Sequence, residues 1–224
     1  MLNPGFLLHV AARKACISEL GKEAIEQGCR QIIVIGAGYD TFAVRAAMAD
    51  PALRCFEIDH PATQAIKRLA LGAVLPPNLS FVPAELSRES LSEVLLRQTT
   101  FSTSTGTLVV IEGVLMYLAP DAVRRLFLTL TELISAPLVC IFTFMNRKNG
   151  QMQFYSAHPL VNWWLKQKQE EFRWGIEAER LPDFLREFGL TASKLYGRQE
   201  FMALLGPQLQ PILADGELVS MAVK

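Results

Sequence analysis

The chain has 224 residues, of which 50% are apolar and 20% are charged, and its 22 lysines and arginines balance its 22 aspartates and glutamates. This composition excludes a disordered tail and favours a single domain over residues 1–224. The charges are interspersed rather than gathered in a basic stripe, so we expect no nucleic-acid partner.

The four cysteines stand far apart and form no Cys-x-x-Cys pair. We therefore expect no metal site and no disulfide framework, and thiols typical of a reducing compartment. The N-terminus lacks the positive segment of a signal peptide, and no apolar run reaches the ~20 residues of a membrane helix. We expect a soluble, cytoplasmic protein with no membrane partner.

A long helical segment opens the chain, and short apolar runs then alternate with helical patterns up to residue 145. We predict helices at 6–27, 61–71, 90–97 and 120–134 and strands at 31–35, 54–58, 79–82, 108–111 and 138–142. This alternation predicts a doubly wound α/β fold, in which helices cover both faces of a mostly parallel sheet. Such sheets bind ligands at the carboxyl ends of their strands.

Residues 146–175 break the alternation. Their mixture of aromatic and polar residues predicts an insertion, partly helical over about 160–172, that lies over the site as a possible substrate lid. A helix at 180–188, ended by Gly189, and two strands at 191–196 and 217–223 complete the predicted sheet.

A glycine turn, Gly36-Ala37-Gly38, follows the first predicted strand and opens a helix. Glycines let a backbone turn tightly and approach a ligand, and Asp59, at the end of the second strand, is placed to accept hydrogen bonds from ribose hydroxyls. Thr41 replaces the third glycine of the dinucleotide fingerprint, which favours a nucleoside ligand without phosphates. The alternative is an ordinary strand-to-helix turn.

Arg13 fills a gap in the apolar stripe of the first helix, where Phe6, Val10, Ile17, Leu20 and Ala24 recur. A buried guanidinium needs an anionic partner. That partner is either a carboxylate of the core or the carboxylate of a ligand held by the arginine fork. An arginine for a carboxylate, glycines for close approach and an acid for a ribose together describe S-adenosylmethionine.

Three segments carry a family resemblance: residues 30–41, 56–61 and 111–118 resemble the leucine carboxyl methyltransferase family. More narrowly, they are similar to its bacterial branch of S-adenosylmethionine-dependent O-methyltransferases. The resemblance implies a class I methyltransferase (Rossmann-like) fold, with a seven-stranded sheet whose last strand is antiparallel. It also implies S-adenosyl-L-methionine as the methyl donor and S-adenosyl-L-homocysteine as the product.

The resemblance assigns roles to residues of this sequence. It places Arg13 at the donor's carboxylate, Gly36 and Gly38 along the donor, Asp59 at its ribose, Glu85 and Leu86 beside its adenine, and Glu112 near its amino group. Glutamate at position 85 departs from the family's aspartate, and Phe42 stands where bacterial members usually have arginine. Read without the family, Glu112 is either a site residue or an ordinary surface carboxylate.

The acceptor side is less defined by sequence. Tyr117, just beyond the fourth strand, is the candidate catalytic residue, and it either orients an acceptor oxygen or packs its ring. His60 is expected as a turn residue, and His158 is the candidate base for a hydroxyl acceptor. Three tryptophans either line an apolar acceptor pocket or pack within the insertion: Trp163, Trp164 and Trp174.

These residues predict an S-adenosylmethionine-dependent O-methyltransferase acting on a carboxylate or hydroxyl of a small molecule or a peptide end. One alternative is an NAD(P)-dependent oxidoreductase, against which Thr41 and the lack of a Tyr-x-x-x-Lys pair argue. The other is a non-catalytic protein that binds S-adenosylmethionine without turnover.

Overall fold

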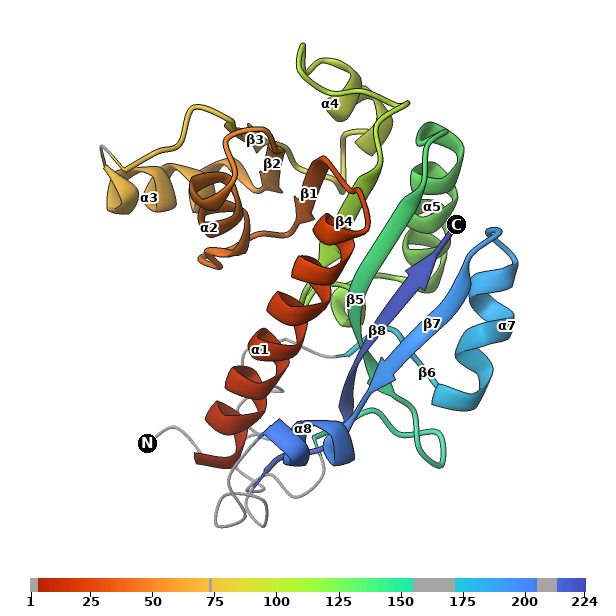
Figure 1. The fold of residues 1–224 in the computed structure, drawn as a ribbon. Coiled ribbons are helices and arrows are strands. Elements are labelled where there is room, and N and C mark those ends of the chain that lie inside the picture. The colour runs from red at the N-terminus through yellow and green to blue at the C-terminus, as the bar shows by residue number, and fades with distance from the viewer. Residues whose placement is uncertain (1–3, 73, 155–171, 205–212) are drawn as a thin grey trace.

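The computed structural model describes residues 4–72, 74–154, 172–204 and 213–224 (Figure 1). The strands form one sheet in the order β3-β2-β1-β4-β5-β8-β7, with β6 paired to the end of β5. Their bounds are β1 Gln31–Ile35, β2 Arg54–Asp59, β3 Leu79–Pro83, β4 Thr107–Ile111, β5 Leu138–Asn146, β6 Gly175–Ile176, β7 Thr191–Tyr196 and β8 Glu217–Val223.

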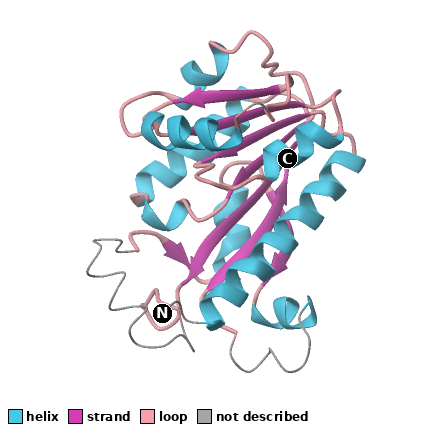
Figure 2. Ribbon diagram, turned by 90° about the vertical axis from the view of Figure 1, so that its left-hand side faces the viewer, coloured by secondary structure: helices cyan, strands magenta, loops and turns pink. Residues whose placement is uncertain are grey.

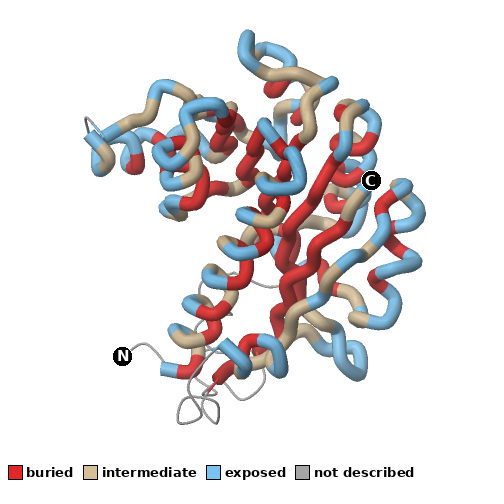
Figure 3. Tube along the Cα trace, in the orientation of Figure 1, coloured by how far each residue is buried: buried red, intermediate tan, exposed pale blue. Residues whose placement is uncertain are grey.

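All strand pairs from β3 to β5 are parallel, whereas β8 is antiparallel to both of its neighbours, β5 and β7. The expected seven-stranded sheet with an antiparallel last strand is therefore confirmed, and the short β6 is an addition to it. Because β1 and β4 are buried along their whole length, their continuous apolar runs reflect central positions in the sheet (Figure 3).

Helices cover both faces of the sheet (Figure 2). One hydrophobic core contains residues of α4, α5 and α7, and a second contains residues of α1, α2 and α8 on the opposite face. The helices are α1 Pro4–Glu26, α2 Phe42–Ala49, α3 Pro61–Leu71, α4 Leu91–Leu96, α5 Pro120–Leu133, α7 Leu181–Arg186 and α8 Arg198–Leu204, with short 3₁₀ turns η1 at Leu115–Tyr117 and η2 at Ala178–Arg180.

The buried face of α1 differs from the predicted stripe. His9, Ala12 and Cys16 are buried together with Ile17, whereas Phe6 and Val10 are only partly buried. The predicted stripe is thus confirmed at Ile17, Leu20 and Ala24 and wrong at Phe6 and Val10. It missed His9, a polar residue that is buried through its contact with a carboxylate from β8.

The structure describes only the two ends of the segment predicted as an insertion. Strand β5 continues four residues beyond the predicted end at 142, and β6 returns beside it at residues 175–176. The helix predicted at 160–172 lies almost wholly outside the described residues. Within the described part of the chain, no helix is long and apolar enough to span a membrane.

Candidate functional site

The glycine turn lies at the carboxyl end of β1, in the middle of the sheet. Gly36 and Gly38 both adopt positive φ, at 67° and 50°, which side chains other than glycine rarely adopt. A Cβ on Gly36 would lie 2.3 Å from Cγ2 of Val114. Gly36 is therefore required both by its backbone conformation and by the close approach of the loop after β4.

Asp59, the last residue of β2, lies against this turn. Its Oδ2 accepts a hydrogen bond from the Gly38 N–H at 2.5 Å, and its Oδ1 accepts one from the His60 N–H at 2.6 Å. His60 in turn accepts a hydrogen bond from the Ala62 N–H and caps α3. His60 is thus a turn residue, as expected, and Asp59 joins the ends of β1 and β2.

One cavity of about 780 Å³ opens at this edge of the sheet. Its lining includes five residues singled out from the sequence: Gly36, Asp59, Glu85, Leu86 and Tyr117. They come together because the carboxyl ends of adjacent parallel strands share one edge. Its volume lies within the range of small-molecule sites in proteins, which is about 300–1,000 Å³.

Arg13 and Glu112 meet elsewhere, between α1 and the end of β4. The Arg13 Nε donates to Glu112 Oε1 at 2.9 Å, and Nη1 donates to Glu217 Oε2 at 2.6 Å. Of the two partners considered for Arg13, the structure contains the carboxylate of the core. Glu112 is not an ordinary surface carboxylate, since its side chain is only 11% exposed.

Glu217, the first residue of β8, was not identified from the sequence. Its side chain is fully buried, and its Oε2 also lies 2.9 Å from Nε2 of His9. Thr143 hydrogen-bonds Glu217 and accepts the N–H of Gly113 at 2.8 Å. Glu217 therefore links α1 to the loop after β4.

The charges of this cluster shift the ionisation of its members. Burial would raise the pKa of Glu217, but Arg13 and His9 outweigh it and lower the pKa to about 2. Burial would lower the pKa of Arg13, but the two glutamates outweigh it and raise that pKa. Both groups are charged at neutral pH, so they form a buried ion pair.

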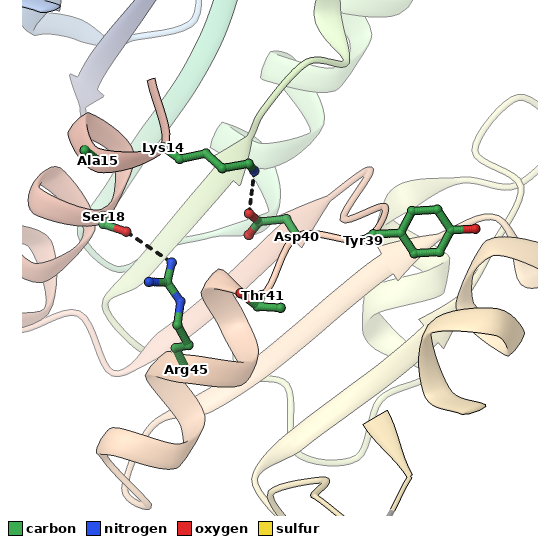
Figure 4. Close-up of a pocket in the computed structure, with 7 residues that line it drawn as sticks. All are labelled: Lys14, Ala15, Ser18, Tyr39, Asp40, Thr41 and Arg45. Carbon is green, nitrogen blue, oxygen red and sulfur yellow. Dashed lines mark hydrogen bonds and ion pairs between the residues drawn. The ribbon is translucent and has the colours of Figure 1, made fainter. Parts of the chain in front are cut away.

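Lys14 extends the cluster to the glycine turn, as Figure 4 shows. Its Nζ lies 2.6 Å from Asp40 Oδ2 and 3.2 Å from Glu112 Oε1. These contacts border an open depression of about 600 Å³ between α1 and α2, where Arg45 donates to Ser18 at 3.2 Å and Tyr39 points away.

A second buried ion pair contacts the backbone of the glycine turn. Lys67 of α3 lies 2.6 Å from Glu57 Oε2 of β2, and its Nζ also donates to the backbone carbonyl of Asp40. Both side chains are at most 4% exposed. Burial raises the pKa of Glu57, and its contact with Lys67 opposes that rise. The turn is therefore fixed by Lys14, Lys67 and Asp59 from three elements.

Of the three tryptophans considered for an acceptor pocket, the structure describes only Trp174. Trp174 is buried and packs against Phe144 and Phe184, so it belongs to the core rather than to an acceptor pocket. Tyr117 lines the cavity with its ring 6.0 Å from that of Phe172. Phe42 is buried beside Gly21 of α1, where it fills the space between α1 and α2. His158, Trp163 and Trp164 lie outside the described residues.

Comparison with known proteins agrees with this architecture. Residues 2–131 match the family model described as leucine carboxyl methyltransferase. The chain is 36% identical to "Putative S-adenosyl-L-methionine-dependent methyltransferase YktD" of Bacillus subtilis (strain 168) over 90 residues, which are 39% of this chain and 29% of that protein. It is 29% identical over 187 residues to a protein of the same description from Mycobacterium marinum, over 80% of this chain and 61% of that protein.

The chain thus spans less than two thirds of the length of either relative. A solved structure from Thermobifida fusca YX, described as a putative methyltransferase, superposes with a TM-score of 0.65 at 17% identity, over 97% of this chain and 80% of that one. The expected class I methyltransferase fold is confirmed. Because the family model covers more than half of the chain, including the glycine turn, Asp59 and Glu112, the chain belongs to the leucine carboxyl methyltransferase family.

Proposed function

We propose that the chain is an S-adenosyl-L-methionine-dependent O-methyltransferase that methylates a carboxylate or hydroxyl group of a small molecule or a peptide end. One observation carries the proposal: a single cavity at the carboxyl edge of the parallel sheet contains Gly36, Asp59 and Leu86 together with Tyr117. The first three suit an adenosyl group, and Tyr117 offers a phenol beside it.

The residues present fit the adenosyl half of the donor. Gly36 lines the cavity and has no side chain, so a ligand can approach its backbone closely. Asp59 has two carboxylate oxygens at the cavity wall, and they suit a ribose with two hydroxyl donors. Leu86 offers partly exposed apolar surface for adenine, and Glu85 offers a hydrogen-bond acceptor for its amino group.

The amino-acid half fits the ion cluster beside the turn. Glu112 supplies a negative charge for an ammonium group. Arg13 has five N–H groups, of which three meet Glu112 and Glu217, so two are left for a ligand carboxylate. Arg13 therefore serves two partners in this proposal: the core carboxylate that the structure contains and the ligand carboxylate expected from the family.

When bound, S-adenosyl-L-methionine supplies a methyl group on a positively charged sulfur, and it leaves as S-adenosyl-L-homocysteine. The chain aligns the acceptor oxygen with that methyl group and excludes water. Such alignment lowers the activation barrier of a reaction by up to about 7–11 kcal/mol. Tyr117 orients the acceptor oxygen. A carboxylate acceptor is already ionised and needs no base, whereas a hydroxyl acceptor requires one.

Calorimetric titration with S-adenosylmethionine, S-adenosylhomocysteine and NADH tests the proposal. We expect micromolar binding of the two adenosyl ligands and none of NADH, followed by methyl transfer in an acceptor screen. NADH binding in their place would support the oxidoreductase alternative. Tight adenosyl binding without turnover on any acceptor would support the non-catalytic alternative.

A matched pair of variants locates the donor. Asp59→Ala should weaken S-adenosylhomocysteine binding about 10- to 100-fold, because a hydrogen bond to a charged group contributes about 1.5–3 kcal/mol. Asp183→Ala removes an exposed carboxylate on α7 and should leave the affinity unchanged. Equal affinities in the two variants would remove Asp59 from the donor site.

A further inference from the structure

The cavity that contains Tyr117 has walls of opposite charge. The carboxylates Asp59, Glu85 and Glu89 line it on the side of β2 and β3, and we call them the acidic wall. Arg125 of α5 and Arg173 line it on the side of α5 and η1, and we call them the basic wall. The acidic wall suits the hydroxyl and amino groups of an adenosine, but the basic wall has no counterpart in that ligand.

The acidic wall is already bonded within the protein. Asp59 accepts two backbone N–H groups, Glu85 lies 3.3 Å from Arg88, and Glu89 accepts the N–H of Glu85 at 3.0 Å. In contrast, neither guanidinium of the basic wall has an ion pair or hydrogen bond with any residue that the structure describes. Two positively charged residues therefore line the cavity, and no group in the described part of the chain neutralises them.

Secondary structure and backbone hydrogen bonds fix the positions of both arginines in the fold. Arg125 belongs to the face of α5 that lines the cavity with Ala122, Leu126 and Thr129, at the three- and four-residue spacing of one helix face. The N–H groups of Arg173 and Trp174 donate to the carbonyl of Met116, at 2.7 and 3.2 Å. Arg173 is thereby tied to η1, the element that carries Tyr117.

Arg124, the neighbouring arginine on α5, has a structural role instead. Arg124 is paired with Glu187 and lies over the ring of Phe184, with its guanidinium carbon 5.4 Å from the ring centre. It does not line the cavity. Of two adjacent arginines on one helix, one is used to pack α7 and the other faces the cavity.

We propose that the basic wall binds an anionic group of the methyl acceptor, a carboxylate or a phosphate, and so anchors the acceptor beside Tyr117. The donor's own carboxylate is assigned to Arg13, which does not line this cavity, so the anion belongs to a different molecule. Arginine forks suit planar carboxylates and phosphates through paired hydrogen bonds. This inference rests on the proposed function and names the chemical class of its acceptor.

Two fluorescent probes that differ by one anionic group test the basic wall on the whole chain saturated with S-adenosylhomocysteine. They are 8-anilinonaphthalene-1-sulfonate and its uncharged counterpart N-phenyl-1-naphthylamine. In the double variant Arg125→Gln/Arg173→Gln we expect the Kd of the sulfonate to rise at least tenfold and that of the uncharged probe to stay within twofold. Arg124→Gln, the control on the same helix, should change neither.

An unchanged sulfonate affinity in the double variant, or an equal loss for the uncharged probe, would overturn the proposal. Displacement of the sulfonate by benzoate, phenyl phosphate and benzamide then identifies the anion. Displacement by benzoate alone or by phenyl phosphate alone supports the proposal and identifies the bound group as a carboxylate or a phosphate. If the uncharged benzamide displaces the sulfonate as effectively as both anions do, the proposal is contradicted. If S-adenosylhomocysteine fails to bind, the proposed function fails, while the same titrations without it still test the basic wall.

Discussion

Replacement of Glu217 by glutamine removes the charge of the fully buried member of the ion cluster and keeps the shape of the side chain. The pKa of Glu217 falls from 4.5 to about 2 in the fold, because Arg13 and His9 outweigh the effect of burial. A depression of this size corresponds to about 3 kcal/mol of stability at neutral pH. We therefore expect Glu217→Gln to lower the free energy of unfolding at pH 7 by about 3 kcal/mol.

The sign of the pH dependence follows from the depressed pKa. The contribution of Glu217 is complete above pH 4.5 and is lost as the pH falls toward about 2, since the unfolded chain takes up the proton first. At pH 3.5 the wild type has lost about 1.4 kcal/mol of this contribution, by the same linkage. The gap between wild type and variant should therefore narrow by that amount between pH 7 and pH 3.5.

Urea unfolding at the two pH values, followed by circular dichroism, measures both gaps. The melting temperature at pH 7 should fall by about 6–12 °C for a chain of this size. Glu187→Gln is the control, because Glu187 is a half-exposed partner of Arg124 and such pairs contribute about 1 kcal/mol or less. A loss below about 1 kcal/mol for Glu217→Gln, or an equal gap at both pH values, would refute the charge-based account.

Three further predictions concern stability and reactivity. Gly36→Ala should destabilise the fold more than Gly38→Ala in urea unfolding, because both glycines have positive φ but only a side chain at position 36 would clash with Val114. In a Val114→Ala background, which removes the clashing atoms, this difference between the two alanine variants should disappear. Lys67→Met leaves Glu57 buried without its cation and should cost about 3–5 kcal/mol in the same assay, most of which the double variant with Glu57→Gln should recover. Burial raises the pKa of the four cysteine thiols to about 11 or 12. The native protein at pH 8 should therefore not react with a disulfide reagent that labels all four thiols after denaturation. Fast labelling of the native protein would contradict their burial.

The sequence was sufficient for features that depend on short stretches of chain. Apolar runs located the parallel strands, and Gly36 and Asp59, at the ends of the first two, had to share one edge once the sheet was parallel. Leu86 was placed at that edge by the family resemblance alone. The helix-to-strand alternation therefore predicted both the fold class and the edge of the sheet at which the cavity opens.

Features that depend on distant pairing could not be predicted in the same way. Glu217 reads as a polar residue at the start of an alternating strand, and its burial follows only from the insertion of β8 between β5 and β7. His9 and Glu217 bury each other, so neither could be identified without the other. One weak signal exists, since His9 has the same helical spacing as Ala12 and Cys16 on α1.

The antiparallel strand β8 also sets the order in which the site can be assembled. Arg13 and Glu217 are 204 residues apart in the chain, so at about 5–20 residues per second a ribosome makes the arginine some 10–40 s before its partner. The glycine turn and Asp59 can come together much earlier, because only 21 residues separate Gly38 from Asp59. During synthesis, then, the nascent chain can form the proposed ribose side of the site long before β8 brings Glu217 to Arg13 and completes the ion cluster proposed for the amino-acid part of the donor.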